Sequence, residues 1–264
     1  MTTVESTTPR KGAPQIERPP SMVQLAAQSL RRMIIGGDLL PGDRVVENQL
    51  TKELGISRPP LREALRVLER EGLIRQVSHK GAIVTPLTLH DVYEIVTLRR
   101  VLERMAIDLA LPVTDGARLA RCRSALGAME LAAADDDPAA LSEAAFGFHL
   151  SVIGLSGHDR LEDTYRSLYL QMLLCMVLNR RARAQRAETP AQDVQRHRRL
   201  LELIEAGDPA PVLAELEHHG DRTFIADIAD TLDDGSPQAR AWLDRLRAEA
   251  SHEPREPAEP EARG

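Results

Sequence analysis

Helix-breaking glycine and proline residues divide residues 22–86 into short segments. Three of these have apolar residues at helical spacing, which predicts helices over 23–35, over 47–54, and from Ser57 to the residue before Gly72. Two β-prone runs come next, 73–77 and 82–85, joined by the turn Ser78-His79-Lys80-Gly81. The order of two helices, a turn, a third helix and a hairpin predicts a winged helix-turn-helix domain that binds DNA.

The third helix of this segment has one apolar face and one basic face. Ser57 is placed to cap its N-terminus, and Leu61, Leu65 and Leu68 form the face expected in the core. The other face carries arginines four residues apart, which are Arg58, Arg62 and Arg66. Arginine suits bidentate hydrogen bonding to guanine in the major groove, so the sequence predicts a recognition helix. The alternative is a solvated helix face on which these arginines pair with glutamates such as Glu63.

Charge is distributed unevenly along the chain. Residues 21–88 carry ten basic and seven acidic side chains, whereas residues 89–264 carry 21 basic and 31 acidic ones, although the whole chain has a net charge of −6. We therefore expect only the N-terminal part to meet a polyanion. With 42% hydrophobic and 28% charged residues, two cysteines and no apolar run long enough to span a bilayer, the chain is expected to be soluble and cytoplasmic.

The remainder of the chain has helical apolar spacing. A long helix is expected over about 91–111, with Leu98, Leu102, Met105 and Leu109 on one face. Further helices are expected at about 115–134, 139–155, 158–183, 191–206, 209–232 and 236–249. The segment 168–178 is apolar nearly all round, which predicts the central buried helix of a bundle.

These patterns predict a mainly α protein with two domains and two tails. The domains are a winged helix-turn-helix domain at 21–88 and an all-α antiparallel helix bundle at 89–249, and the disordered tails are residues 1–20 and 250–264.

The segment from Pro41 to Val84 resembles the DNA-binding domain of the GntR family of bacterial transcription regulators. The most characteristic residues are Ser-Arg-x-Pro-x-Arg-Glu-Ala-Leu over 57–65, followed by Glu-Gly-Leu over 71–73. The resemblance implies that Ser57, Arg58 and Arg62 contact operator DNA, that Lys80 and Gly81 at the wing tip enter the minor groove, and that Arg44 contacts a phosphate. One member of the family also uses an arginine of the second helix, where this sequence has Asn48.

Residues 89–232 resemble the all-helical FCD domain of the FadR-type branch of that family. The resemblance is carried by Leu-Arg-Arg-Val-Leu-Glu over 98–103, by Phe148-His149, and by His197 and His219 around Gly207-Asp208. It implies a domain for dimerisation and for binding an effector, with Arg99, His149, His197 and His219 at the effector site.

Three histidines on different predicted helices are suitable ligands for zinc or nickel. Metal-binding members of the branch have an aspartate four residues before the first of these histidines, where this sequence has Ala145, and Glu143 lies on another face of the helix. Three interpretations of His149, His197 and His219 remain: a metal site completed by water or a ligand carboxylate, a metal-free anion site, or unrelated histidines. Arg99 either binds an effector carboxylate through its planar fork or pairs with Glu103 on the surface.

The expected function is a homodimeric transcription regulator whose operator binding changes when a small organic acid binds, and the resemblance implies repression relieved by that ligand as the commoner mode. A homodimer is expected because two recognition helices must reach successive major grooves about 34 Å apart. A hydrolytic enzyme is disfavoured, since the sequence shows no general base, nucleophile elbow or phosphate loop. The third alternative is a purely structural dimeric DNA-binding protein or a metal-ion sensor without an organic ligand.

Overall fold

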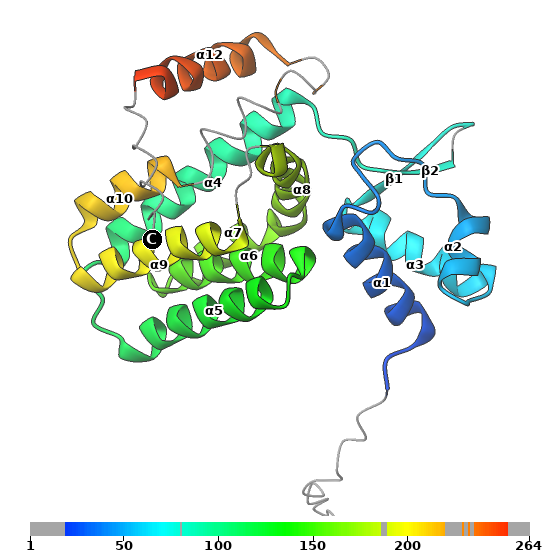
Figure 1. The fold of residues 1–264 in the computed structure, drawn as a ribbon, viewed down its shortest axis with the longest axis horizontal. Coiled ribbons are helices and arrows are strands. Elements are labelled where there is room, and N and C mark those ends of the chain that lie inside the picture. Colours follow the sequence, from blue (N-terminus) through cyan, green and yellow to red (C-terminus); the bar gives the residue numbers. More distant parts are fainter. Residues whose placement is uncertain are drawn as a thin grey trace, which may run out of the picture.

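The N-terminal part of the chain has the predicted order of elements. In the computed structural model, which describes residues 19–79, 81–185, 189–219, 229, 232 and 235–252, this part consists of α1 (Met22–Gly36), α2 (Glu47–Glu53), α3 (Arg58–Arg70), β1 (Ile74–Val77) and β2 (Gly81–Val84). The strands form an antiparallel hairpin in which Ile74 pairs with Val84. Helix–helix–helix–wing order is therefore confirmed, and Figure 1 shows this unit at one end of the molecule.

The core of this unit is built from the apolar face of α3. Leu61, Leu65 and Leu68 are buried as predicted, and α3 packs against α1. Ser57 occupies the N-cap position of α3, although its side chain makes no capping hydrogen bond there. Arg31 of α1 reaches Glu71 with two bonds of 2.7 and 2.8 Å from one guanidinium nitrogen, which ties α1 to the end of α3.

The second part is helical throughout its described residues. Its helices are α4 (Leu89–Ala110), α5 (Gly116–Ala134), α6 (Pro138–Gly154), α7 (Asp159–Ser167), α8 (Tyr169–Gln185), α9 (Pro190–Ala206), α10 (Pro209–His218) and α12 (Pro237–His252). The single helix expected at 158–183 is wrong, because the chain breaks at Leu168 into α7 and α8. The helix expected at 209–232 is described only to His218, and most of residues 220–232 lie outside the described residues.

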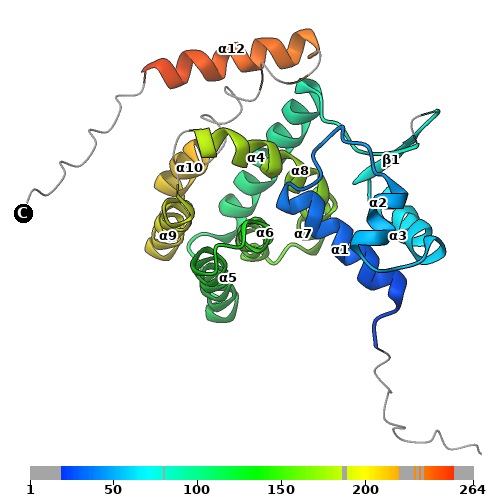
Figure 2. The same ribbon diagram turned by 45° about the vertical axis from the view of Figure 1, so that its right-hand side comes forward.

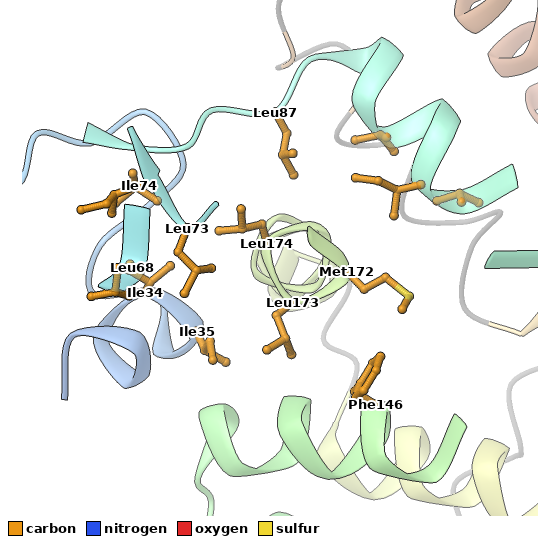
Figure 3. Packing of buried hydrophobic residues seen from close by; sticks show 14 of the residues in the cluster. Ile34, Ile35, Leu68, Leu73, Ile74, Leu87, Phe146, Met172, Leu173 and Leu174 are labelled. Carbon is orange, nitrogen blue, oxygen red and sulfur yellow. The ribbon is translucent and has the colours of Figure 1, made fainter. Parts of the chain in front are cut away.

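Helix α8 joins the two parts of the molecule. Leu173 and Leu174 of α8 are buried beside Ile35 of α1 and Leu73, while Met172 faces Phe146 of α6 (Figure 3). The prediction of a central buried helix at 168–178 is correct only in part: Met172, Leu173, Leu174 and Val177 are buried, whereas the other residues of the segment are half-buried or exposed, and the helix lies at the junction between the two parts. One hydrophobic cluster runs through both parts, so neither has a separate core at this point.

The C-terminal helix α12 packs on the beginning of α4 (Figures 1 and 2). Trp242 is 5% exposed, and its ring contacts that of Tyr93 edge to face with 5.5 Å between centroids. Gly235 precedes this helix, and a Cβ added there would lie 2.8 Å from a methyl group of Leu89. The helix continues to His252, so residues 250–252, expected in a disordered tail, are helical, whereas both tails otherwise lie almost entirely outside the described residues.

Among the described residues, no helix is both long enough and apolar enough to cross a membrane.

Candidate functional site

The predicted recognition helix presents its arginines to solvent. Arg58, Arg62 and Arg66 are all exposed on α3, opposite its buried leucines, and Ser57 is exposed at its start. Helix α3 therefore presents the basic surface expected for a reader of the major groove.

Each of these arginines is held by a neighbouring polar side chain. Arg58 donates to Asn48 Oδ1 at 2.9 Å, and Arg62 donates to Glu47 at 3.0 Å. Arg66 pairs with Glu63 at 2.7 Å, which is the partner named in the solvated-face alternative. Because these contacts are exposed, each contributes little to stability, so exchange of the Asn48 amide and the two carboxylates for DNA groups costs little.

The wing and the turn before α2 supply further predicted contacts. Gly81 is exposed and has φ of +79°, a left-handed conformation that glycine adopts without strain. Arg44 is also exposed, and its backbone forms an isolated bridge with Ile83 of the wing. Lys80 lies outside the described residues.

The three predicted histidines converge inside the helical part. His149 comes from α6, His197 from α9 and His219 from the residue after α10. Each is at most 5% exposed, and one ring nitrogen from each lies within 4.8 Å of the others. The interpretation of three unrelated histidines is therefore wrong: the chain brings them into one buried cluster.

The ring nitrogens of the cluster are arranged for a further partner. His197 Nδ1 donates to the backbone carbonyl of Asp193 at 2.8 Å, which leaves Nε2 as an acceptor that has no partner among the described residues. Both ring nitrogens of His219 are buried and also have no hydrogen-bond partner among the described residues. Burial lowers the pKa of His197 to about 3 and that of His219 well below its usual range, so both imidazoles are neutral and able to bind a metal.

Glu103 lies beside this cluster and accepts from three side chains. Its Oε1 is 2.9 Å from Arg99 Nε, 3.0 Å from His149 Nδ1 and 2.8 Å from the Tyr165 hydroxyl. Burial alone would raise the pKa of this carboxyl group, but Arg99 and His149 lower it well below its usual range. Glu103 is thus a buried carboxylate that fixes the proton of His149 on Nδ1 and leaves Nε2 for a ligand.

Arg99 makes the pair with Glu103 that one of the two sequence interpretations expects, and it also contacts the histidine cluster. It pairs with Glu103, but its side chain is only 17% exposed, so the pair is not on the surface. Its Nη2 lies 3.3 Å from Nδ1 and 3.1 Å from Nε2 of His149. Because Arg99 Nη2 is almost equidistant from the two ring nitrogens, it lies over the face of the imidazole ring. At these distances in the plane of the ring, it would collide with Cε1. A ligand carboxylate at the cluster would thus meet a guanidinium.

The donor set fits a metal that prefers nitrogen ligands and keeps open positions, such as zinc or nickel. Within the described part of the chain, the group of side chains whose ligand atoms lie within 4.8 Å of one another contains no carboxylate. Ala145 is 2% exposed one helical turn before His149, and Glu143 is exposed, so neither adds an anionic ligand.

A cavity of about 400 Å³ lies between α4 and α10 next to Glu103. Arg100, Arg104 and Glu217 line it together with Leu213 and Leu216. Glu103 lines this cavity and also contacts His149, but none of the three histidines lines it.

Two residues of the site were not predicted. Tyr165 gives no sequence signal, because its contact with Glu103 joins residues 62 positions apart. Asp193 does give one, since it lies four residues before His197 on α9 and its side chain comes within 3.6 Å of that ring.

Comparison with known proteins assigns each part of the chain separately. The family model "Bacterial regulatory proteins, gntR family" matches residues 23–84, and the model "FCD domain" matches residues 94–222. The uncharacterized HTH-type transcriptional regulator YdhC of Bacillus subtilis is 32% identical over 179 residues, which are 66% of this chain and 77% of that protein. The gluconate operon transcriptional repressor of the same species is 25% identical over 209 residues, 79% of this chain and 84% of that one.

The fold has a solved counterpart. The crystal structure of a putative transcriptional regulator from Rhodococcus sp. RHA1 is similar with a TM-score of 0.61 at 22% identity, and the match covers 86% of this chain and 97% of that chain.

Proposed function

Because this chain belongs to the GntR family of bacterial regulatory proteins, it is a DNA-binding transcription regulator and not an enzyme, and we propose that it is a repressor released from its operator by a small carboxylic acid. The observation that carries the effector part is the buried cluster of His149, His197 and His219 beside Arg99. The relative named as the gluconate operon transcriptional repressor supports the assignment as a repressor.

The proposed operator contacts come from α3, the wing and the turn before α2. Arg58, Arg62 and Arg66 read bases in the major groove, and Ser57 and Arg44 bind phosphates nearby. Gly81, together with Lys80, approaches the minor groove. In the free protein Asn48 and Glu47 keep Arg58 and Arg62 oriented, and DNA replaces these partners on binding.

The effector site acts through residues that this chain already orients. Arg99 binds the acid carboxylate, Glu103 holds His149 in the required tautomer, and the backbone of Asp193 does the same for His197. A zinc or nickel ion held by the three histidines would supply Lewis acidity toward the carboxylate. The same residues without a metal form an anion site, and metal analysis of the purified protein distinguishes the two.

Helix α4 connects this site with the DNA-binding part. It begins at Leu89, shortly after the wing, with a capping box between Thr88 and Asp91, and it carries Arg99 about three turns later and Glu103 about four turns later. We expect α4 to have different positions in the DNA-binding and the released protein. The acid then changes operator affinity only to the extent that it binds one of these two states more tightly than the other.

We expect the regulator to act as a homodimer through α4. Four large apolar side chains form one exposed stripe along this helix, namely Leu98 (42% exposed), Val101 (63%), Met105 (42%) and Leu109 (54%). The stripe is bordered by Arg104 and Asp108. In a dimer with a twofold axis, Arg104 of each copy can therefore pair with Asp108 of the other copy. Val101→Glu should yield monomers in sedimentation velocity, whereas the control Leu131→Glu, on an exposed leucine of α5, should leave dimers. A dimeric Val101→Glu variant would contradict this surface.

The DNA-binding assignment is tested on a duplex selected from a random library by the purified protein. Arg62→Ala should weaken specific binding by about 1–3 kcal/mol and relax preference at one base pair. Arg160 is an exposed arginine of α7, so Arg160→Ala removes the same charge far from α3 in the sequence and serves as the matched control. Parental affinity of Arg62→Ala would contradict the assigned face.

The effector assignment is tested on the same complex with a panel of small mono-, di- and hydroxycarboxylic acids, with and without Ni²⁺. Release by an acid, lost in His197→Gln while operator affinity without acid is kept, supports the proposal. Release by the metal alone supports the ion-sensor alternative.

A further inference from the structure

Helix α12 lies across the beginning of α4, close to the point where the DNA-binding part joins the helical part (Figures 1 and 2). It follows the segment that the FCD model matches, which ends at residue 222. The buried side chains of α12 belong to the same hydrophobic cluster as those at the start of α4. They are Ala239, Trp242, Leu243 and Leu246 of α12, and Leu89, Val92 and Val96 of α4.

Two side-chain contacts fix the position of α12 along α4. The Ser236 hydroxyl accepts the backbone N–H of Ala239 at 3.2 Å, and its oxygen lies 2.8 Å from Nδ1 of His90 on α4. About one turn further along α4, Tyr93 meets the ring of Trp242 with 5.5 Å between centroids. The N-terminal half of α12 is therefore attached to the first two turns of α4 by a polar and an aromatic contact.

Gly235, which precedes these contacts, packs directly on Leu89. A Cβ added at position 235 would lie 2.8 Å from Cδ2, 3.1 Å from Cγ and 3.2 Å from Cβ of Leu89. The stem of this side chain is thus nearly as close as its tip, so a rotation of the leucine cannot make room. Any side chain at position 235 must therefore push the start of α12 away from α4.

The connection between the wing and this part of α4 is short. Thr85 belongs to the DNA-binding part, because its backbone N–H donates to the Leu73 carbonyl at 2.9 Å and its hydroxyl donates to the Gly72 carbonyl at 2.6 Å. Only residues 86–88 lie between Thr85 and the first residue of α4, Leu89. The direction of the first turns of α4 therefore determines where the wing and α3 can lie. Helix α8 holds α1, and α12 holds this second connection.

From these contacts we infer that α12, together with Gly235 and Ser236, is a strap that sets the orientation of the DNA-binding part. The inference rests on the proposed homodimer. In a dimer, the second DNA-binding part binds its half-site as an intramolecular step, whose effective concentration depends on the geometry and stiffness of the connection. A seated strap keeps the two α3 helices at the separation of the half-sites. The residues of the strap are thus positioning residues, which act on operator binding through α4.

The strap is loosened in the full-length protein by Gly235→Val, which wedges α12 from Leu89. Ala241→Val adds bulk on the exposed side of the same helix and is the matched control. His90→Ala is a milder second variant, because it removes the contact with Ser236 and leaves the apolar packing in place. Trp242 is the only tryptophan of the chain, so its emission reports directly whether α12 is seated.

The experiment compares binding to three kinds of duplex derived from a selected operator: the full operator, a single half-site, and operators with one base pair inserted or removed between the half-sites. Gly235→Val should shift the Trp242 emission to longer wavelength and weaken binding to the full operator about tenfold. It should also discriminate less against altered spacing, while its affinity for the single half-site equals that of the parent. His90→Ala should show a smaller loss of the same kind, and Ala241→Val should behave as the parent.

Three results would overturn the inference. They are an unshifted Trp242 emission in Gly235→Val, parental affinity and spacing preference in a variant whose emission has shifted, and an equal loss of affinity on the single half-site. If Gly235→Val does not fold, His90→Ala decides on the same duplexes. A parent protein that binds the full operator no better than the single half-site would instead refute the proposed homodimer, and the effect of the strap on spacing with it.

Discussion

Replacement of Glu103 by glutamine tests how much the buried carboxylate stabilises the sensor part. Three donors converge on its Oε1 at 2.8–3.0 Å, and the side chain is only 4% exposed. Glutamine keeps the shape and one acceptor but removes the charge that compensates Arg99. Removing one partner of a buried ion pair costs about 3–5 kcal/mol. Because the Arg99 side chain retains 17% exposure, we expect a value at the lower end, about 3 kcal/mol.

The assay is urea unfolding followed by far-UV circular dichroism at pH 7.5 with EDTA present. Tyr165→Phe removes only one hydrogen bond to the carboxylate, so we expect a loss of about 1–3 kcal/mol. The double variant should lose less than the sum, since both changes act on one network. The control is Glu162→Gln, which breaks a surface pair with Arg166 of 2.7 Å and should cost less than about 1 kcal/mol. A Glu103→Gln variant as stable as this control would refute the reasoning.

Two further predictions concern the histidines and α12. His197 has a pKa lowered to about 3 in the folded protein, so the unfolded chain binds more protons below its usual value of 6.5. Stability should therefore fall as pH decreases from 6.5, by about 1.4 kcal/mol per pH unit for this residue, and His197→Gln should flatten the slope measured in EDTA by urea unfolding. Trp242→Ala should cost about 3–5 kcal/mol because the ring is buried against Tyr93. Trp242→Phe should cost clearly less, and equal losses would contradict the packing of α12 on α4.

The DNA-binding part was predictable because its signals are local. Glycines placed at turns, a leucine stripe and arginines four residues apart all act within one helix or one turn, and Gly55, Gly72 and Gly81 indeed have positive φ. The break at Leu168 was not predictable from apolar spacing, because Leu161 and Tyr165 of α7 keep the helical spacing of buried residues up to Leu168, where the apolar run of α8 begins.

The site was predictable in its members but not in its arrangement. The resemblance named Arg99 and the three histidines, whereas their convergence depends on the packing of α4, α6, α9 and the end of α10. The sequence offered Glu103 only as an i+4 partner of Arg99, and its bonds to His149 and Tyr165 require helices that are far apart in the chain. The exposure of Leu98, Met105 and Leu109, in contrast to buried Leu102, also depends on which neighbours cover α4.

The shared hydrophobic cluster at α8 has a consequence for recombination. Ile35 and Leu73 on one side belong to the same apolar cluster as Leu173 and Leu174 on the other (Figure 3). A chimaera that joins the reading unit of one relative to the sensor of another would bring together two apolar surfaces that were never fitted to each other. Such proteins should melt earlier than either parent unless the facing residues of α1 and α8 are transplanted as a set.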